Sequence, residues 1–369
     1  MTSPRIRFSF LLLPFCVSCL SLNYPIDPNQ TSSANARAES SALEELLPQT
    51  EVALSWSDLT RLAREHRQRG ELEEAGERLD QAALQVELLP PTHARRRTVF
   101  GMRARLAIAL AEAGEIEAAD ELADTLFAEA DTAPDLGGAA LISLALSVAD
   151  RRPQESQLRL LRIALTTAQA GTTSRSRMKL ALRVAETAYA EKDLELARRA
   201  IDQAVLDAEH TGPSRRARIA SLELFKSRIA LAQSDLETAE SSAIRANRLF
   251  DQISASPSER GIAEATLAEI LAEKGDIDKA LAIARGAYAR IDGATPLEAH
   301  AERVILVAQA RVRRSVGDSA SARQHYERAL EIAGLDTVAD NDLVRRITQE
   351  LQDLHRSTTS SSSEAPIEP

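Results

Sequence analysis

The six histidines are the first candidates for chemistry, because histidine is the commonest metal ligand and a frequent general base. No two of them stand four residues apart, the spacing that brings two imidazoles to one helix face at a metal site. They are His66, His93, His210, His300, His325 and His355. The sequence therefore predicts no metal ion and no cofactor.

Paired carboxylates and nucleophile motifs suggest no reaction either. Glu73 and Glu74 lie in a stretch rich in both signs of charge, where a solvated helix surface explains them. The sequence contains no glycine-rich phosphate loop and no serine at a nucleophile elbow. We therefore expect a protein that is not an enzyme.

Cys16 and Cys19 are the only cysteines and stand together near the N-terminus. A redox pair is one interpretation, but no βαβ pattern surrounds them. Arg5 and Arg7 precede an apolar run at residues 8–17, which is the layout of a secretory signal. The run is too short to span a bilayer comfortably.

Val17, Ser18 and Cys19 resemble the end of a bacterial lipoprotein signal, in which a cysteine after an apolar-small motif is acylated before cleavage. The resemblance implies that residues 1–18 are a signal peptide and that a lipid on Cys19 anchors the protein to a bacterial membrane, facing the periplasm. Cys16 stands where that family usually has leucine. Ordinary secretion and an uncleaved signal anchor therefore stay open.

The composition describes the rest of the chain in broad terms. Residues 19–49 are rich in Ser, Asn, Pro and Ala without sustained periodicity, which predicts a flexible tether. Over the whole chain 44% of residues are hydrophobic but only 3% are aromatic, so the apolar surface comes from Ala and Leu, which favours helix. A net charge of −10 argues against nucleic-acid binding.

One turn signature recurs through the body of the chain. It consists of a small or polar residue, an acid, an aliphatic residue and, three positions later, an alanine. The alanines are Ala75, Ala119, Ala197, Ala239, Ala280 and, in a degenerate copy, Ala322. They recur every 41 to 44 residues except for one gap of 78, in which an eroded copy at residues 132–171 has its turn at residues 150–153.

Residues that favour a helix start recur with the same period. Acids three residues after Thr132, Ser256 and Thr295 have the spacing of a capping box. The full set is Thr50, Thr92, Thr132, Thr172, Ser214, Ser256, Thr295 and Thr337. Two signals with one period predict a repeated unit of helix A, a tight turn and helix B.

The spacing of small residues in these units resembles the tetratricopeptide (TPR) repeat over about residues 50–336. In one unit the matching residues are Leu267, Ala268, Leu271, Ala280, Ala284 and Ala287. The resemblance implies an all-α, right-handed α-solenoid of about seven helix pairs, followed by a capping helix at residues 337–357 and a disordered tail at 358–369. The unit of about 41 residues exceeds the family's 34, and of the consensus aromatics only Tyr326 remains.

The same resemblance indicates a binding surface, because in this family the face of helix A turned away from helix B lines a concave groove. By that alignment the groove presents Arg64, Arg67, Glu186, Tyr189, Arg228, Glu269, Arg311 and Arg314. Arginine holds a carboxylate with two parallel hydrogen bonds, which suits an extended peptide or an acidic terminus. The alternative is ordinary solvated helix surface.

These observations together predict a non-enzymatic scaffold or adaptor of the cell envelope that binds a protein or peptide partner. A ligand- or peptide-binding accessory subunit of an envelope transport system is the alternative, although 3% aromatic residues makes an aromatic-lined pocket unexpected. An enzyme is the third possibility.

Overall fold

The computed structural model describes residues 54–167, 172–212, 214–291, 299–335 and 341–362. The helices in these ranges all belong to one compact unit, Ser55–Pro369. No strand is present in the described ranges. The predicted signal peptide, Cys19, the whole predicted tether and the helix start at Thr50 lie outside them.

The described helices pack as seven successive pairs, each made of a helix A and the helix B that follows it. The pairs are α2 (Trp56–Arg69) with α3 (Leu72–Val86), α4 (Ala94–Ala113) with α5 (Ile116–Thr132), α6 (Gly138–Val148) with α7 (Gln154–Thr167), α8 (Ser174–Ala190) with α9 (Leu194–Ala208), α10 (Arg215–Ala232) with α11 (Leu236–Gln252), α12 (Pro257–Glu273) with α13 (Ile277–Ile291), and α14 (Ala299–Ser315) with α15 (Ser319–Leu335).

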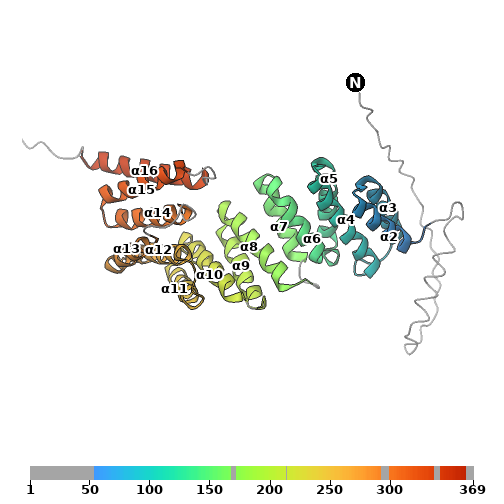
Figure 1. Ribbon diagram of the computed structural model, residues 1–369, viewed down its shortest axis with the longest axis horizontal. Helices are drawn as coiled ribbons and strands as arrows, with labels where there is room; N and C mark the ends of the chain where they lie inside the picture. Colours follow the sequence, from blue (N-terminus) through green and yellow to red (C-terminus); the bar gives the residue numbers. More distant parts are fainter. Residues whose placement is uncertain (1–53, 168–171, 213, 292–298, 336–340, 363–369) are drawn as a thin grey trace, which may run out of the picture. The chain divides into compact units, whose positions relative to one another are not determined.

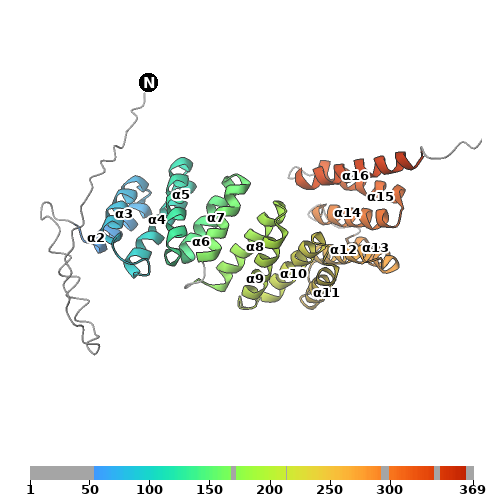
Figure 2. The same ribbon diagram turned by 180° about the vertical axis from the view of Figure 1, so that it is seen from behind.

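Each pair also packs on the next, so that neighbouring helices in the chain lie side by side from α2 to α15 (Figures 1 and 2). The A helices of most successive pairs also contact one another directly, as α2 does with α4 and α12 with α14. This arrangement confirms the predicted all-α solenoid of helix pairs.

The predicted turns are confirmed by their backbone conformation. Helix A ends in a left-handed residue in six of the seven pairs, and this conformation reverses the chain into helix B. Four of these residues are glycine, which adopts a positive φ without steric cost. The other two are Lys192 and Ser234, with φ of 64° and 60°.

The predicted alanines lie at the contacts between helices. Ala75, Ala119, Ala197, Ala239, Ala280 and Ala322 are all fully buried. A methyl side chain lets two helix backbones approach closely, whereas a longer side chain would hold them apart. The alanine of each turn signature therefore fixes how tightly helix B packs on helix A.

The predicted helix starts are only partly correct. Ser256 forms a complete capping box with Glu259, as predicted. The start predicted at Thr132 is wrong: α5 continues through this residue, and its hydroxyl donates to the Glu129 carbonyl 2.9 Å away. Two other starts are shifted by one residue, since His93 instead of Thr92 caps α4 and Thr173 instead of Thr172 caps α8.

Ser214 precedes α10 as predicted but makes no side-chain cap. Thr295 and Thr337 lie outside the described residues. The eroded third unit has its turn where the sequence predicts it, with a short 3-10 helix at Ala149–Arg151 between α6 and α7.

A final helix, α16 (Asn341–Ser362), packs on α15. Ile347 and Leu354 of this helix are buried in a cluster with Tyr326, which is itself fully buried. The sequence predicts such a covering helix, but α16 extends five residues past the predicted boundary at residue 357. In the described part of the chain, no helix is both long and apolar enough to cross a membrane.

Candidate functional site

Four successive A helices, from α8 to α14, carry a charged residue at one repeat position, seven residues before the acid of the turn. These residues alternate in sign from Glu186 on α8 through Arg228 on α10 and Glu269 on α12 to Arg311 on α14. Glu350 on α16 follows with the next negative charge. We call these five residues the charge column.

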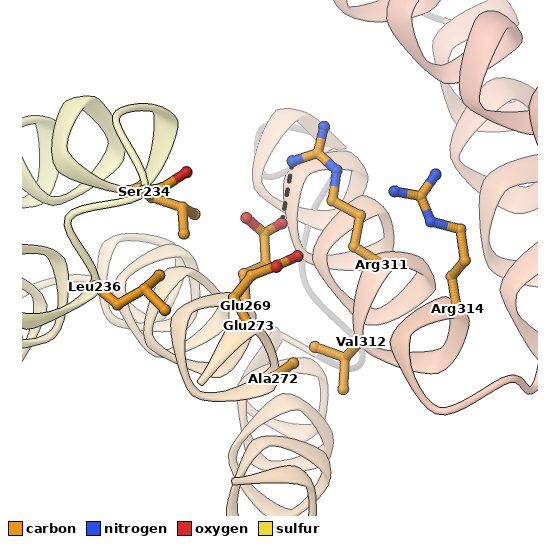
Figure 3. Close-up of a pocket in the computed structure, with 9 residues that line it drawn as sticks. Ser234, Leu236, Glu269, Ala272, Glu273, Arg311, Val312 and Arg314 are labelled. Carbon is orange, nitrogen blue, oxygen red and sulfur yellow. Dashed lines mark hydrogen bonds and ion pairs between the residues drawn. The ribbon is translucent and has the colours of Figure 1, made fainter. Parts of the chain in front are cut away.

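Arg311 is the best-paired member of the column. It donates two hydrogen bonds to Glu350, at 2.6 Å from Nη2 to Oε1 and 3.1 Å from Nε to Oε2. On its other side it donates to Glu269, at 3.2 Å from Nη1 to Oε1 (Figure 3). Burial alone would lower the pKa of Arg311, but the two carboxylates outweigh it and raise that pKa.

Tyr326 completes the environment of Glu350. Its hydroxyl donates a 2.5 Å hydrogen bond to Glu350 Oε2. Burial alone would raise the pKa of Glu350, but the hydrogen bonds from Arg311 and Tyr326 outweigh it and lower that pKa. Burial, reinforced by the Glu350 carboxylate, raises the pKa of the Tyr326 phenol. Glu269, Arg311, Glu350 and Tyr326 thus form a network of side-chain contacts that joins α12, α14, α15 and α16.

Arg228 differs from Arg311 because it is half-buried yet its guanidinium makes no hydrogen bond or ion pair with any described residue. Burial lowers its pKa, and the charge of Glu269 offsets only part of that effect. Arginine keeps its proton in proteins, so the guanidinium carries the cost of desolvation without a direct partner.

Beside Arg228 lies the one aromatic pair found among the described residues. Tyr189 on α8 and Phe225 on α10 meet edge to face, with ring centroids 5.6 Å apart and an interplanar angle of 75°. Both rings are partly exposed. The Tyr189 phenol also contributes electrostatically to the environment of Arg228. This part of the A-helix face therefore combines aromatic surface with an unpaired positive charge.

The remaining predicted groove residues make fewer ion pairs with described residues than Arg311 does. Arg314 on α14 is exposed and has no ion pair with a described residue, although its charge helps to lower the pKa of Glu350. Glu186 is exposed and pairs with Arg183 at 3.4 Å. Arg64 and Arg67 lie on α2, which packs only against the first two pairs, and no described contact joins them to the other six residues.

The structure thus brings Arg228, Glu269 and Arg311 into one electrostatic environment, while the partner-binding role of all eight residues stays a prediction. The sequence alone did not identify three residues that belong to the charge column or neighbour it, namely Phe225, Tyr326 and Glu350. Glu350 carried a detectable signal, because it lies nearly one period after Arg311.

The described residues contain no group of three or more His, Cys, Asp or Glu side chains that could hold a metal ion. A hollow beside the column has a volume of about 370 Å³ and lies between the end of α10, the start of α11, α12 and α14. The arrangement offers charges and apolar surface for binding.

No protein-family model matches the chain, and no curated protein matches it in sequence. Solved structures with a similar backbone include a tetratricopeptide repeat protein from Parabacteroides merdae, at 12% identity and a TM-score of 0.40, covering 81% of this chain and 98% of that one. The apo form of RapI is similar at 10% identity and a TM-score of 0.48, covering 81% and 86%.

YrrB, described as a TPR protein with an unusual peptide-binding site, is similar at 14% identity and a TM-score of 0.36, covering 60% of this chain and 97% of that one. Because these sequence identities and TM-scores are low, the fold assignment rests on the helix pairs, turns and buried alanines of this chain.

Proposed function

We infer that the protein is a non-enzymatic scaffold of the cell envelope that binds a protein or peptide partner on the face of its A helices. The observation that carries this inference is Arg228, a half-buried guanidinium without a hydrogen-bond or ion-pair partner among the described residues. A stack of helix pairs offers an extended surface and needs no reactive centre to use it.

The physical reason is the cost of a partly desolvated charge. A guanidinium that has lost water without gaining a partner is destabilising, and a carboxylate from a partner would restore two charge-assisted hydrogen bonds. The adjacent rings of Tyr189 and Phe225 would add apolar contact for the same partner. Aromatic and arginine side chains are the types that contribute most to binding energy in protein interfaces.

Arg311 has a different role in this proposal. Because two carboxylates of the chain already neutralise it, a partner gains little by approaching it, and its contribution is to hold α14 against α12 and α16. The binding role predicted for the groove arginines therefore falls mainly to Arg228 and Arg314.

An affinity pulldown from envelope extracts tests this proposal when the wild-type chain is compared with Arg228→Ala. The variant should lose the partner by about tenfold or more in affinity, the loss of one or two charged hydrogen bonds. Arg248→Ala is the matched control, because Arg248 is exposed on α11 and also has no ion pair among the described residues. Equal recovery by both variants would remove Arg228 from the binding site.

The envelope location rests on Cys19 and the signal-like segment that precedes it. If Cys19 is acylated, Cys19→Ala should move the protein from the membrane fraction to the soluble fraction, and the wild type should carry the mass of acyl chains. A wild type without acyl mass, together with a variant that remains bound to membranes, would exclude the lipid anchor while leaving the binding face untouched.

The alternative function, an accessory subunit of an envelope transport system, is favoured by the hollow beside the charge column, whose volume of about 370 Å³ lies in the range of small-ligand pockets. Mass spectrometry of the protein purified under native conditions separates the two functions. A bound small molecule would support the accessory subunit, and a co-purified polypeptide would support the scaffold.

A further inference from the structure

The hollow between α10, α12 and α14 has an apolar floor. Ala272 and Val312 are buried at its base, and Leu231 and Leu236 border it with partly exposed side chains. Figure 3 shows Leu236 on one side and Val312 on the other, with Ala272 between them. Leu231 and Leu236 keep part of their aliphatic surface in water, so a ligand that covers them gains free energy.

The rim of the hollow carries charges of both signs, but they are not equally available. Glu269 and Arg311 bind each other at 3.2 Å, and Arg311 is also held by Glu350. Glu273 and Arg314 are exposed, and neither makes an ion pair or a side-chain hydrogen bond with a described residue. The hollow therefore offers a ligand one free carboxylate and one free guanidinium.

The two free charges belong to different helices. Glu273 is the last residue of α12, while Arg314 lies near the end of α14. The apolar residues line the same hollow as these two charges. A ligand that satisfied both charges and also covered the aliphatic surface would therefore need a basic, an acidic and an apolar group.

We propose that this hollow binds a segment of the partner that carries an aliphatic side chain together with one acidic and one basic residue. The aliphatic side chain covers Leu231 and Leu236, the acid pairs with Arg314, and the basic residue pairs with Glu273. The proposal rests on the function inferred above, and it specifies the partner sequence that the A-helix face recognises.

Charge complementarity distinguishes this ligand from simpler ones. An acidic segment alone would leave Glu273 facing like charge, and a basic segment alone would do the same for Arg314, at a cost in affinity. The central Glu269–Arg311–Glu350 network adds one net negative charge, which further disfavours a segment made only of acids.

Selection from a random peptide display library on the full chain tests the proposal even while the partner is unidentified. The wild type should enrich peptides that combine an aliphatic residue with an acid and a base in one preferred order. Arg314→Glu should bind these peptides at least tenfold more weakly, as should Glu273→Arg. Combining the two substitutions exchanges the rim charges, so the double variant should enrich peptides in which the order of acid and base is reversed.

Arg248→Glu is the matched control for charge reversal, because Arg248 is an exposed arginine outside the hollow. It should leave the enriched sequences unchanged. The proposal is overturned if the wild type enriches peptides whose binding is insensitive to Arg314→Glu and Glu273→Arg, and in that case binding elsewhere on the A-helix face would survive. It is also overturned, together with the proposed peptide binding, if no peptide is enriched on any form.

Discussion

At the scale of single residues, Lys192 shows how the repeat tolerates a departure from its own pattern. It occupies the left-handed position at the end of α8, with φ of 64°, where four equivalent turns have glycine. An L-residue in this conformation brings Cβ close to the following carbonyl oxygen, which costs about 1–2 kcal/mol. The turn forms nevertheless, because packing of α8 on α9 fixes it.

Lys192→Gly should therefore stabilise the protein. We expect the free energy of unfolding to rise by about 0.5–1 kcal/mol, because relief of strain exceeds the extra entropy that glycine gives the unfolded chain. Gly275→Ala at the equivalent turn should lower it by about 1 kcal/mol, since φ there is 87°. Denaturant unfolding measures both, and a loss of stability in Lys192→Gly would show that its turn is not strained.

Glu350 gives a prediction about acid stability. Its pKa in the folded state is lowered from the ordinary value of 4.5, so its contribution to stability is complete above that value and is lost as the pH falls through the folded pKa. Glu350→Gln should cost about 1–3 kcal/mol at neutral pH, because Arg311 loses a charged partner. It should also flatten the decline in stability below about pH 5.

Melting temperature measured against pH checks this prediction. Glu331→Gln is the control, since Glu331 on α15 pairs with Arg328 through side chains that are 63% and 53% exposed and should contribute little. If Glu350→Gln and the wild type lose stability in parallel as the solution is acidified, the docking of α16 does not depend on the charge of Glu350.

At the scale of elements, the close packing of helix B on helix A depends on the buried alanines. Ala280 is fully buried in a cluster with Ala268, Leu271 and Ala284. Ala280→Arg would place a long charged side chain in this contact and should destabilise the protein by roughly 3 kcal/mol or more, through overpacking and an unpaired buried charge.

Lys279→Arg is the neighbouring control, because the Lys279 side chain is 72% exposed and pairs only with Asp276 in the described structure. It should change stability by less than about 0.5 kcal/mol. Thermal unfolding of the two variants compares them directly, and equal melting temperatures would contradict the assignment of Ala280 to the helix contact.

The turns and the alanines could be predicted from sequence because each reflects a local requirement. A left-handed residue favours glycine, and a close helix contact favours alanine, wherever the rest of the chain lies. The helix starts were less predictable. Several Ser and Thr residues stand near each start, and a shift of one residue, as from Thr172 to Thr173, leaves the pattern unchanged.

At the scale of the whole molecule, the sequence predicts which residues share the A-helix face but not which of them pair. The alignment groups Arg228 and Arg311 as equivalent, whereas the structure pairs Arg311 with Glu269 and Glu350 and leaves Arg228 without an ion pair among described residues. The difference arises from α16, because its Glu350 reaches Arg311 only once that helix has packed on α15.

The distribution of charge along the column follows from this pairing. Its C-terminal end is neutralised by the chain itself, while Arg228 and the aromatic pair of Tyr189 and Phe225 remain able to accept a partner. In the proposed function, stability and partner binding thus depend on different members of one repeated position. A partner should accordingly contact α8 and α10 around Arg228, as well as the hollow that α12 and α14 border.

Site-specific photo-crosslinking in cells tests this central claim most directly. A photoreactive amino acid would replace either Tyr189 on the A-helix face or Leu206 on helix B α9, where the side chain is 57% exposed. We predict a covalent adduct with the partner from the Tyr189 position and none from the Leu206 position. An adduct from the Leu206 position alone would contradict binding on the A-helix face.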